Sequence, residues 1–298
     1  MRNAFADEIR NHPDAVLLSG DIGYKLFDDI PEDRFYNCGI AEANMIGVAA
    51  GLALSGKRPV VYTIASFATG RCYEQIKLDV GYHNLPVVIV GTGAGLSYAQ
   101  LGPTHHALDD IALMRLIPNM TILAPCDPLE TRWALRAALK HDGPVYIRLG
   151  KAGEPQLQEP PHVWNMGDVQ TLREGHDVCL ISYGPIMDTV LKVAERLEKE
   201  GVSVQVENFH TLKPLDTKRL TELALAFDPI IVVEEHSCIG GAGSAFIENN
   251  AEHLPVIHLA VPDTFIPGAM SQEEARRRHG LDEDHIFNTV LEAHNGLY

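Results

Sequence analysis

The chain has 298 residues, which is long enough for two cores of ordinary domain size. Its 40 Asp and Glu residues outnumber its 24 Lys and Arg residues, so the formal net charge is −16. This acidic balance, without a cluster of basic residues, argues against nucleic acid or an anionic membrane as a partner, and no apolar run is long enough to span a bilayer.

Short apolar runs alternate with helical patterns along the chain. The runs that predict buried parallel strands lie at residues 16–19, 59–63, 86–91, 121–124, 145–148, 177–182, 203–206, 230–233 and 256–259. Helical patterns fill most of the intervals, for example at 129–140 and at 186–200, where Gly201 follows as a stop signal. This alternation predicts an α/β fold of two domains built on doubly wound open sheets.

The boundary between the two predicted domains lies where the alternation stops. Pro155, Pro160, Pro161 and mixed polar residues interrupt the pattern in the way a linker does. We therefore predict a first domain at 1–152, a linker at 153–175 and a second domain at 176–298.

Two features bear on location in the cell. The first eight residues include Asp7 and Glu8, where a signal peptide needs an apolar core. The five cysteines are odd in number, and none belongs to a Cys-x-x-Cys pair. Both features favour a reducing cytoplasm.

The most unusual residue of the first domain is Glu42, an acid that precedes a run of small and apolar residues at 45–54. A carboxylate buried there is costly unless it is paired or protonated. We therefore predict that Glu42 meets a ligand. The alternative is that Glu42 only faces the positive end of a helix dipole.

Two further polar segments follow predicted strands. Residues 63–75 carry aromatic side chains and an arginine, and residues 101–110 contain two histidines and two aspartates. Loops at the carboxyl ends of parallel strands line one crevice, so both segments are expected to meet Glu42 there.

These segments belong to a series of motifs that resembles the pyrimidine-binding and C-terminal domains of transketolases and deoxyxylulose-phosphate synthases. The resemblance runs nearly from end to end of the chain. Its motifs are Ile40-Ala41-Glu42, Ser66-Phe67 with Arg71, Gly102-Pro103-Thr104-His105, Pro118-Asn119-Met120, Pro125-Cys126-Asp127, the segment 211–216, Val233-Glu234-Glu235-His236 and the segment 240–244.

The resemblance implies thiamine diphosphate as the cofactor, a group that stabilises carbanions. Glu42 matches the family glutamate that hydrogen-bonds the pyrimidine ring, and Phe67 matches the aromatic residue that stacks on it. Tyr73 is expected to extend this aromatic wall, unless it packs in the core. Arg71 matches an arginine of deoxyxylulose-phosphate synthases and is a further candidate for the cofactor site, with an ion pair on the helix surface as its alternative.

The same resemblance implies that His105 hydrogen-bonds substrate hydroxyls and transfers a proton. A metal site of His105, His106, Asp109 and Asp110 is an alternative, although this spacing is no recognised ligand set. Arg148 and Lys151 lie near positions where relatives bind phosphate, so they are candidates for holding an anionic substrate. Their alternative is a solvated strand end.

The chain also departs from the family pattern. Leu101 stands where transketolases carry an aspartate for a donor hydroxyl, and residues 91–95 read Gly-Thr-Gly-Ala-Gly where they carry a histidine for the acceptor phosphate. Two sugar-phosphate contacts are therefore missing, which argues against ordinary pentose phosphates as substrates.

Full-length relatives hold the diphosphate and Mg²⁺ through a Gly-Asp-Gly motif with a downstream Asn, and the nearest string here, at 19–23, lacks the second glycine. The expected protein is thus one subunit of a split transketolase, active with an N-terminal partner subunit in a heterotetramer, that transfers a two-carbon ketol unit between sugars or sugar phosphates. The alternatives are a decarboxylative deoxyxylulose-type synthase, a 2-oxoacid dehydrogenase beta-type subunit and a non-catalytic binding partner.

Overall fold

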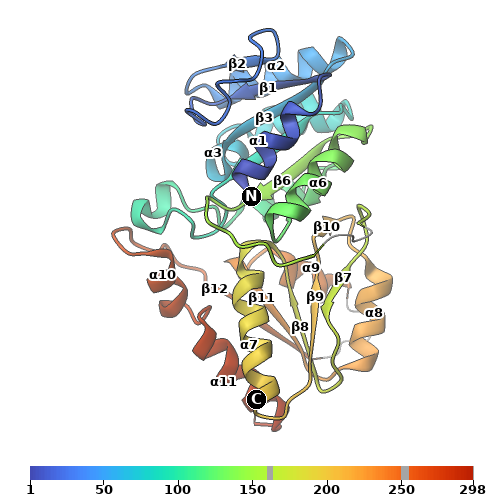
Figure 1. Cartoon of the computed structure of the whole chain (residues 1–298), viewed down its shortest axis with the longest axis vertical. Helices are drawn as coiled ribbons and strands as arrows, with labels where there is room; N and C mark the ends of the chain where they lie inside the picture. Colours follow the sequence, from blue (N-terminus) through green and yellow to red (C-terminus); the bar gives the residue numbers. More distant parts are fainter. Residues whose placement is uncertain (160–163, 250–254, 298) are drawn as a thin grey trace.

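Two open sheets, each flanked by helices, form two domains that follow one another along the long axis of the molecule (Figure 1). The structure is a computed structural model that describes residues 1–159, 164–249 and 255–297. None of the helices in this described part is long and apolar enough to cross a membrane. The α/β architecture with two sheets confirms the fold class predicted from the sequence.

The first domain is built on a seven-stranded sheet with the order β10-β5-β6-β4-β3-β1-β2. Its strands are β1 (Ala15–Ser19), β2 (Phe35–Asn37), β3 (Arg58–Ile64), β4 (Val88–Thr92), β5 (Thr121–Leu123) and β6 (Val145–Leu149), joined by β10 (Thr211–Lys213) from the second domain. Its helices are α1 (Arg2–Arg10), α2 (Glu42–Leu54), α3 (Ala65–Thr69), α4 (Tyr73–Gln75), the π-helix η1 (Ile76–Tyr82), the 3-10 helix η2 (Ala99–Thr104), α5 (Asp110–Arg115) and α6 (Pro128–Lys140).

Alternate residues of each strand enter different cores. Val16 and Leu18 of β1 pack with Met45 and Ile46 of α2, whereas Leu17 packs on the opposite face with the side of the domain that carries α1 and α6. Successive side chains of a strand point to opposite faces, so a fully apolar strand such as β1 is stable only between two helical layers. This is why the apolar runs are continuous rather than alternating.

The second domain is built on a five-stranded sheet with the order β12-β11-β8-β9-β7. Its strands are β7 (Gln170–Arg173), β8 (Val178–Ser182), β9 (Val204–Asn208), β11 (Ile230–Ser237) and β12 (Val256–Val261). Its helices are the 3-10 helix η3 (Gly184–Ile186), α7 (Met187–Lys199), α8 (Thr217–Ala226), α9 (Ala242–Asn249), α10 (Gln272–Arg278) and α11 (Glu283–His294).

All nine predicted strands are present, and three short strands were not predicted. β2, β7 and β10 have three or four residues each and lack an apolar run. β7 and β10 pair antiparallel at the edges of their sheets, where a strand needs little apolar surface. β11 continues four residues beyond the predicted end, because Glu234, Glu235 and His236 are buried by polar contacts that the sequence did not reveal.

The segment predicted as a linker differs in part from that prediction. β7 lies inside residues 153–175 and pairs with β9, so the second sheet begins within that segment. The preceding residues are fixed to the first domain, since the backbone N–H groups of Leu157 and Gln158 each donate to Asp127 at 3.0 Å. Pro160 and Pro161 lie outside the described residues.

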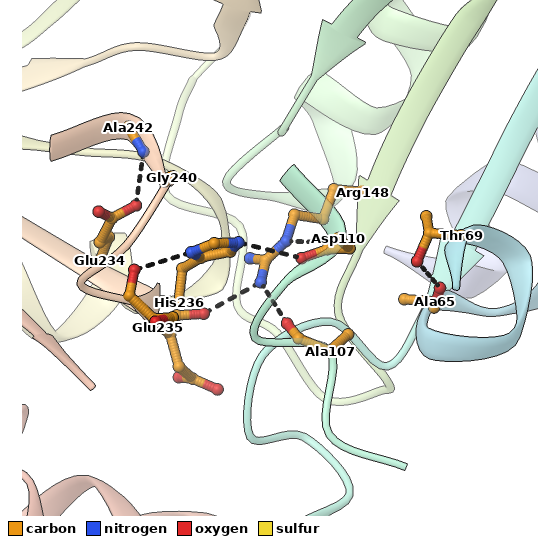
Figure 2. A network of polar contacts seen from close by, with 12 residues as sticks. Ala65, Thr69, Ala107, Asp110, Arg148, Glu234, Glu235, His236, Gly240 and Ala242 are labelled. Carbon is orange, nitrogen blue, oxygen red and sulfur yellow. Dashed lines mark hydrogen bonds and ion pairs between the residues drawn. The ribbon is translucent and has the colours of Figure 1, made fainter. Parts of the chain in front are cut away.

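A buried polar network joins the two domains (Figure 2). Arg148, at the end of β6, is 2% exposed, and its Nε donates to Asp110 at 2.8 Å. Its Nη2 donates to the backbone carbonyls of Ala107 in the first domain and Glu235 in the second, both at 3.0 Å. Burial works against the charge of Arg148, but Asp110 outweighs it and raises the pKa of the guanidinium above its usual value.

Glu234 anchors the start of α9 in the second domain. Its carboxylate accepts the N–H groups of Ala242 at 2.8 Å and Gly243 at 3.0 Å, and it contacts His258 Nε2 at 2.6 Å. Burial alone would raise the pKa of Glu234, but the His258 hydrogen bond and the nearby histidine charges lower it from 4.5 to about 2. The ionised carboxylate therefore stabilises the folded second domain.

We expect Glu234→Gln to destabilise the protein by about 3 kcal/mol at pH 7, the free energy that corresponds to the lowered pKa. A carboxyl group with a depressed pKa contributes stability above its unfolded value of 4.5, and this contribution is lost as pH falls toward about 2. Thermal unfolding at pH 7 and at pH values below 4.5 measures the difference between variant and parent, which should shrink on acidification. Glu273→Gln, on the exposed side of α10, is the control.

Candidate active site

The candidate site lies at the carboxyl edge of the first sheet. β1 pairs in parallel with β2 on one side and with β3 on the other, so the strand order reverses at β1. Ligands of open α/β sheets bind at such a switch point. The segments that leave β2, β3 and β4 at this edge carry Glu42, Phe67 and His105.

Glu42 is the first residue of α2 and is 1% exposed. Because Glu42 begins the helix, its carboxylate lies at the positive end of the helix dipole. Ala41, the N-cap residue, makes no side-chain hydrogen bond there. Its Oε2 accepts a hydrogen bond from Arg71 Nη1 at 2.8 Å. The predicted burial of Glu42 is therefore confirmed, and Arg71 is its charged partner.

Phe67 and His105 complete a contiguous cluster with this ion pair. The Arg71 guanidinium lies 4.4 Å from the centre of the Phe67 ring, and the Phe67 and His105 ring centres are 5.1 Å apart. The structure thus brings together four of the predicted residues, from α2, α3, the turn after α3 and the segment after η2.

Tyr98 and Lys151 extend the cluster at one side of His105. The Tyr98 and His105 ring centres are 6.0 Å apart, and Lys151 Nζ lies 4.6 Å from the centre of the Tyr98 ring. Burial raises the pKa of Tyr98, so its hydroxyl stays protonated. Lys151 therefore contacts Tyr98 at the edge of the cluster, and its role in holding an anionic substrate stays a prediction. Tyr98 was not predicted, although its place three residues before Leu101 was a usable signal.

The other predicted residues have different surroundings. The Arg148 side chain is enclosed in the domain interface, which makes it a poor candidate for direct substrate contact and corrects that expectation. Tyr73 packs against the core of the first domain, as its alternative interpretation stated.

The alternative metal site is not supported by the geometry. Asp110 pairs with Arg148, whereas His105 points to Phe67, so these side chains diverge. His106 is buried, which lowers the pKa of its imidazole. Among residues 1–159, 164–249 and 255–297, no group of three or more His, Cys, Asp and Glu side chains is arranged to hold a metal ion.

The second domain holds the loop that carries His105. Glu235 accepts a hydrogen bond from the Leu96 N–H, and the Ala269 N–H donates to the Gln100 carbonyl at 3.1 Å. Gly102 has a φ of +74°, and a Cβ on it would lie 3.0 Å from the backbone nitrogen of Gly268. The two chain segments are therefore packed backbone against backbone.

The His105 backbone is linked directly to this contact. The N–H groups of His105 and His106 donate to the Gly102 carbonyl at 3.0 and 3.2 Å. The position of Gly268 thus fixes Gly102, and Gly102 fixes the turn that presents His105.

Comparison with known proteins identifies this arrangement. Residues 1–154 match the transketolase pyrimidine-binding domain, and residues 167–286 match the transketolase C-terminal domain. The chain belongs to the transketolase family.

Relatives of similar length include subunits of transketolases. The chain is 37% identical to an apulose-4-phosphate transketolase subunit of Actinobacillus succinogenes over 98% of this chain and 96% of that protein. It is 38% identical to the 6-deoxy-6-sulfo-D-fructose transketolase subunit of a Clostridium species over 82% of this chain and 75% of that one. A solved split-gene transketolase, described as an inactive beta4 tetramer, has a TM-score of 0.86 at 36% identity and covers 99% of this chain and 96% of its own.

The family implies thiamine diphosphate, and the site fits one end of that cofactor. A buried carboxylate beside an aromatic ring provides a polar contact and a stacking surface for the flat aminopyrimidine. The described residues of this chain provide no comparable set of ligands for magnesium.

We expect Gly268→Ala to loosen the loop that carries His105 without unfolding the protein. A Cβ on Gly268 would lie 3.0 Å from the Gly102 nitrogen and 3.1 Å from the Gln100 oxygen, so the loop must move away. Hydrogen–deuterium exchange of residues 95–107 should become about tenfold faster, which corresponds to about 1.4 kcal/mol. Gly51→Ala, where an added Cβ meets nothing within 4 Å, is the matched control, and equal exchange of the loop in both variants would contradict the role of Gly268.

Proposed function

We propose that the chain is the pyrimidine-binding and C-terminal subunit of a split transketolase, which transfers a two-carbon ketol unit from a ketose or ketose phosphate to an aldose with thiamine diphosphate. The observation that carries this proposal is the cluster of buried Glu42 with Phe67 and His105 at the switch point of the first sheet. The family match over both domains supports it.

Each residue of the cluster has a separate role in this proposal. Glu42 hydrogen-bonds the cofactor ring, and Phe67 stacks on it. The bound cofactor supplies a thiazolium carbon that stabilises the transferred carbanion. His105 Nδ1 lies 2.8 Å from Thr104 Oγ1, which leaves Nε2 to hydrogen-bond a substrate hydroxyl and to move its proton.

The proposal includes a partner subunit that holds the diphosphate and Mg²⁺. The sequence lacks the Gly-Asp-Gly motif, and the described residues offer no metal cluster. In addition, the apolar side chains of Ile40, Val48 and Leu54, at and before α2, are exposed. A helix that is apolar on all sides normally packs against protein, so we propose that the partner covers these side chains in a heterotetramer.

The substrates are proposed to be sugars or sugar phosphates. Lys151, near Tyr98 and His105, is the candidate for holding an anionic group. The relatives carry names with two different substrates, apulose 4-phosphate and 6-deoxy-6-sulfo-D-fructose, so the family match alone does not select one. We also propose a cytoplasmic location, because all five cysteines are free thiols.

A decarboxylative synthase that uses pyruvate is the second candidate. Arg71 supports it as a residue shared with deoxyxylulose-phosphate synthases, and the structure ties Arg71 to Glu42. A panel of ketose donors and pyruvate, given to the reconstituted complex, separates the two candidates. No turnover with any donor would favour a non-catalytic partner, and turnover of branched 2-oxoacids would favour a dehydrogenase subunit.

We expect Glu42→Ala to lower kcat of the reconstituted enzyme by at least about a hundredfold, because the cofactor ring loses its carboxylate contact. Assembly with the partner subunit should be unchanged, since Glu42 is buried inside the first domain. Steady-state kinetics and size-exclusion chromatography measure the two properties. Normal kcat in the variant would exclude the proposed role.

We expect Leu101→Asp to raise kcat/KM for hydroxylated ketose donors several-fold relative to pyruvate. Leu101 is exposed next to the turn that carries His105, so an aspartate there can accept a hydrogen bond from a donor hydroxyl. Leu101→Asn is a matched control without the charge. An unchanged donor preference would show that position 101 does not contact the donor.

A further inference from the structure

Arg71 makes two contacts that the cofactor ring is proposed to make. Its Nη1 donates to Glu42 Oε2 at 2.8 Å, and its guanidinium lies over the Phe67 ring at 4.4 Å. The flat, cationic guanidinium therefore hydrogen-bonds the Glu42 carboxylate and covers the face of the Phe67 ring at the same time. These are the polar contact and the stacking contact that are proposed for the aminopyrimidine.

The chain without cofactor needs such a group. Glu42 is 1% exposed, and a buried carboxylate without a partner is strongly unfavourable. The charge of Glu42 also acts on its neighbour Cys72, where burial and then Glu42 raise the thiol pKa to about 12. Arg71 supplies the opposite charge at hydrogen-bond distance.

The Arg71 side chain can also move away from Glu42 and Phe67. The side chain is 47% exposed, so nearly half of it already faces solvent. Glu42 is fixed in α2, and Phe67 is fixed in α3 with His105 against its ring. Of the three side chains, Arg71 is the one that can rotate outward without disturbing a helix.

We propose that Arg71 is a stand-in for the cofactor ring: it neutralises Glu42 and covers Phe67 in the free chain, and the aminopyrimidine displaces it on binding. This inference rests on the proposed function. Binding of the ring then includes the free energy of breaking the Glu42–Arg71 pair, so Arg71 stabilises the free chain and weakens cofactor affinity.

Opposite effects on stability and affinity distinguish a stand-in from an ordinary cofactor-binding residue. A residue that only binds the cofactor would lower affinity when removed and leave the free chain unchanged. A residue that is only structural would lower stability and affinity together.

The first experiment uses the full chain without cofactor or partner. Arg71→Met should lower Tm by roughly 2–4 °C, whereas Arg71→Met in a Glu42→Gln background should have little effect, because no buried charge remains to be neutralised. Additive effects in this double-mutant cycle would overturn the pairing. Arg71→Lys keeps the charge but loses the planar stack, so its Tm should lie between those of Arg71→Met and the parent. Arg71→Lys replaces Arg71→Met in the cycle if the latter does not fold.

A matched control is available in the second domain. Arg196 lies over the Phe287 ring at 4.6 Å and pairs with Asp284 at 2.9 Å, on the surface and away from the candidate site. Arg196→Met should change neither the Glu42 cycle nor cofactor affinity.

The second experiment measures the dissociation constant of thiamine diphosphate in the reconstituted complex, by fluorescence quenching in the presence of Mg²⁺. Arg71→Met should tighten binding roughly threefold to tenfold, the gain expected when a competing ion pair of ordinary strength is removed. Weaker or unchanged binding in Arg71→Met would overturn the stand-in role while leaving the proposed function intact. A parent complex that binds no thiamine diphosphate would instead refute the proposed function.

Discussion

The buried ion pair between Arg148 and Asp110 is the contact on which the two-domain arrangement depends. Arg148 is the last but one residue of β6 in the first sheet, and its guanidinium donates to the Glu235 carbonyl of the second domain. Two charges removed from water are costly, and a pair of this kind is tolerated when hydrogen bonds satisfy the remaining donors. Here the Ala107 and Glu235 carbonyls both accept hydrogen bonds from Nη2 of Arg148. Losing either partner would leave an uncompensated charge between the domains, which typically costs about 3–5 kcal/mol.

The same interface controls the loop that carries His105. Ala107 accepts a hydrogen bond from Arg148, Leu96 donates to Glu235, and Gly102 packs against Gly268. The second domain therefore contributes to the site by fixing a loop of the first domain, without placing a side chain in the Glu42 cluster. A loop held at three points loses little further entropy when a ligand binds.

Charge balance at buried carboxylates is the second constraint on this chain. Glu42 is buried at the start of α2, and a buried carboxylate requires a partner. The partly exposed Arg71 satisfies this requirement without closing the site permanently. Glu234 differs from Glu42, because its buried carboxylate has its partners within the second domain, namely two backbone N–H groups, His258 and the Tyr183 hydroxyl.

The sequence by itself determined the strands that are apolar on both faces, the two-domain order, and the residues that the family motifs mark, among them Glu42, Phe67 and His105. These features depend on local composition and on short spacings, which a chain carries in one dimension. The tertiary structure alone decided the partners of the charged residues. From the sequence, Arg148 fits a phosphate ligand and a solvated strand end equally well. Only the structure shows that its Nε donates to Oδ2 of Asp110, 38 positions away in the sequence, at 2.8 Å. Likewise β7 and β10 are strands because of the edges they pair with. The Arg71–Glu42 contact exists because α2 follows β2 and the turn after α3 follows β3, and these two strands flank β1 and end at the same edge of the sheet.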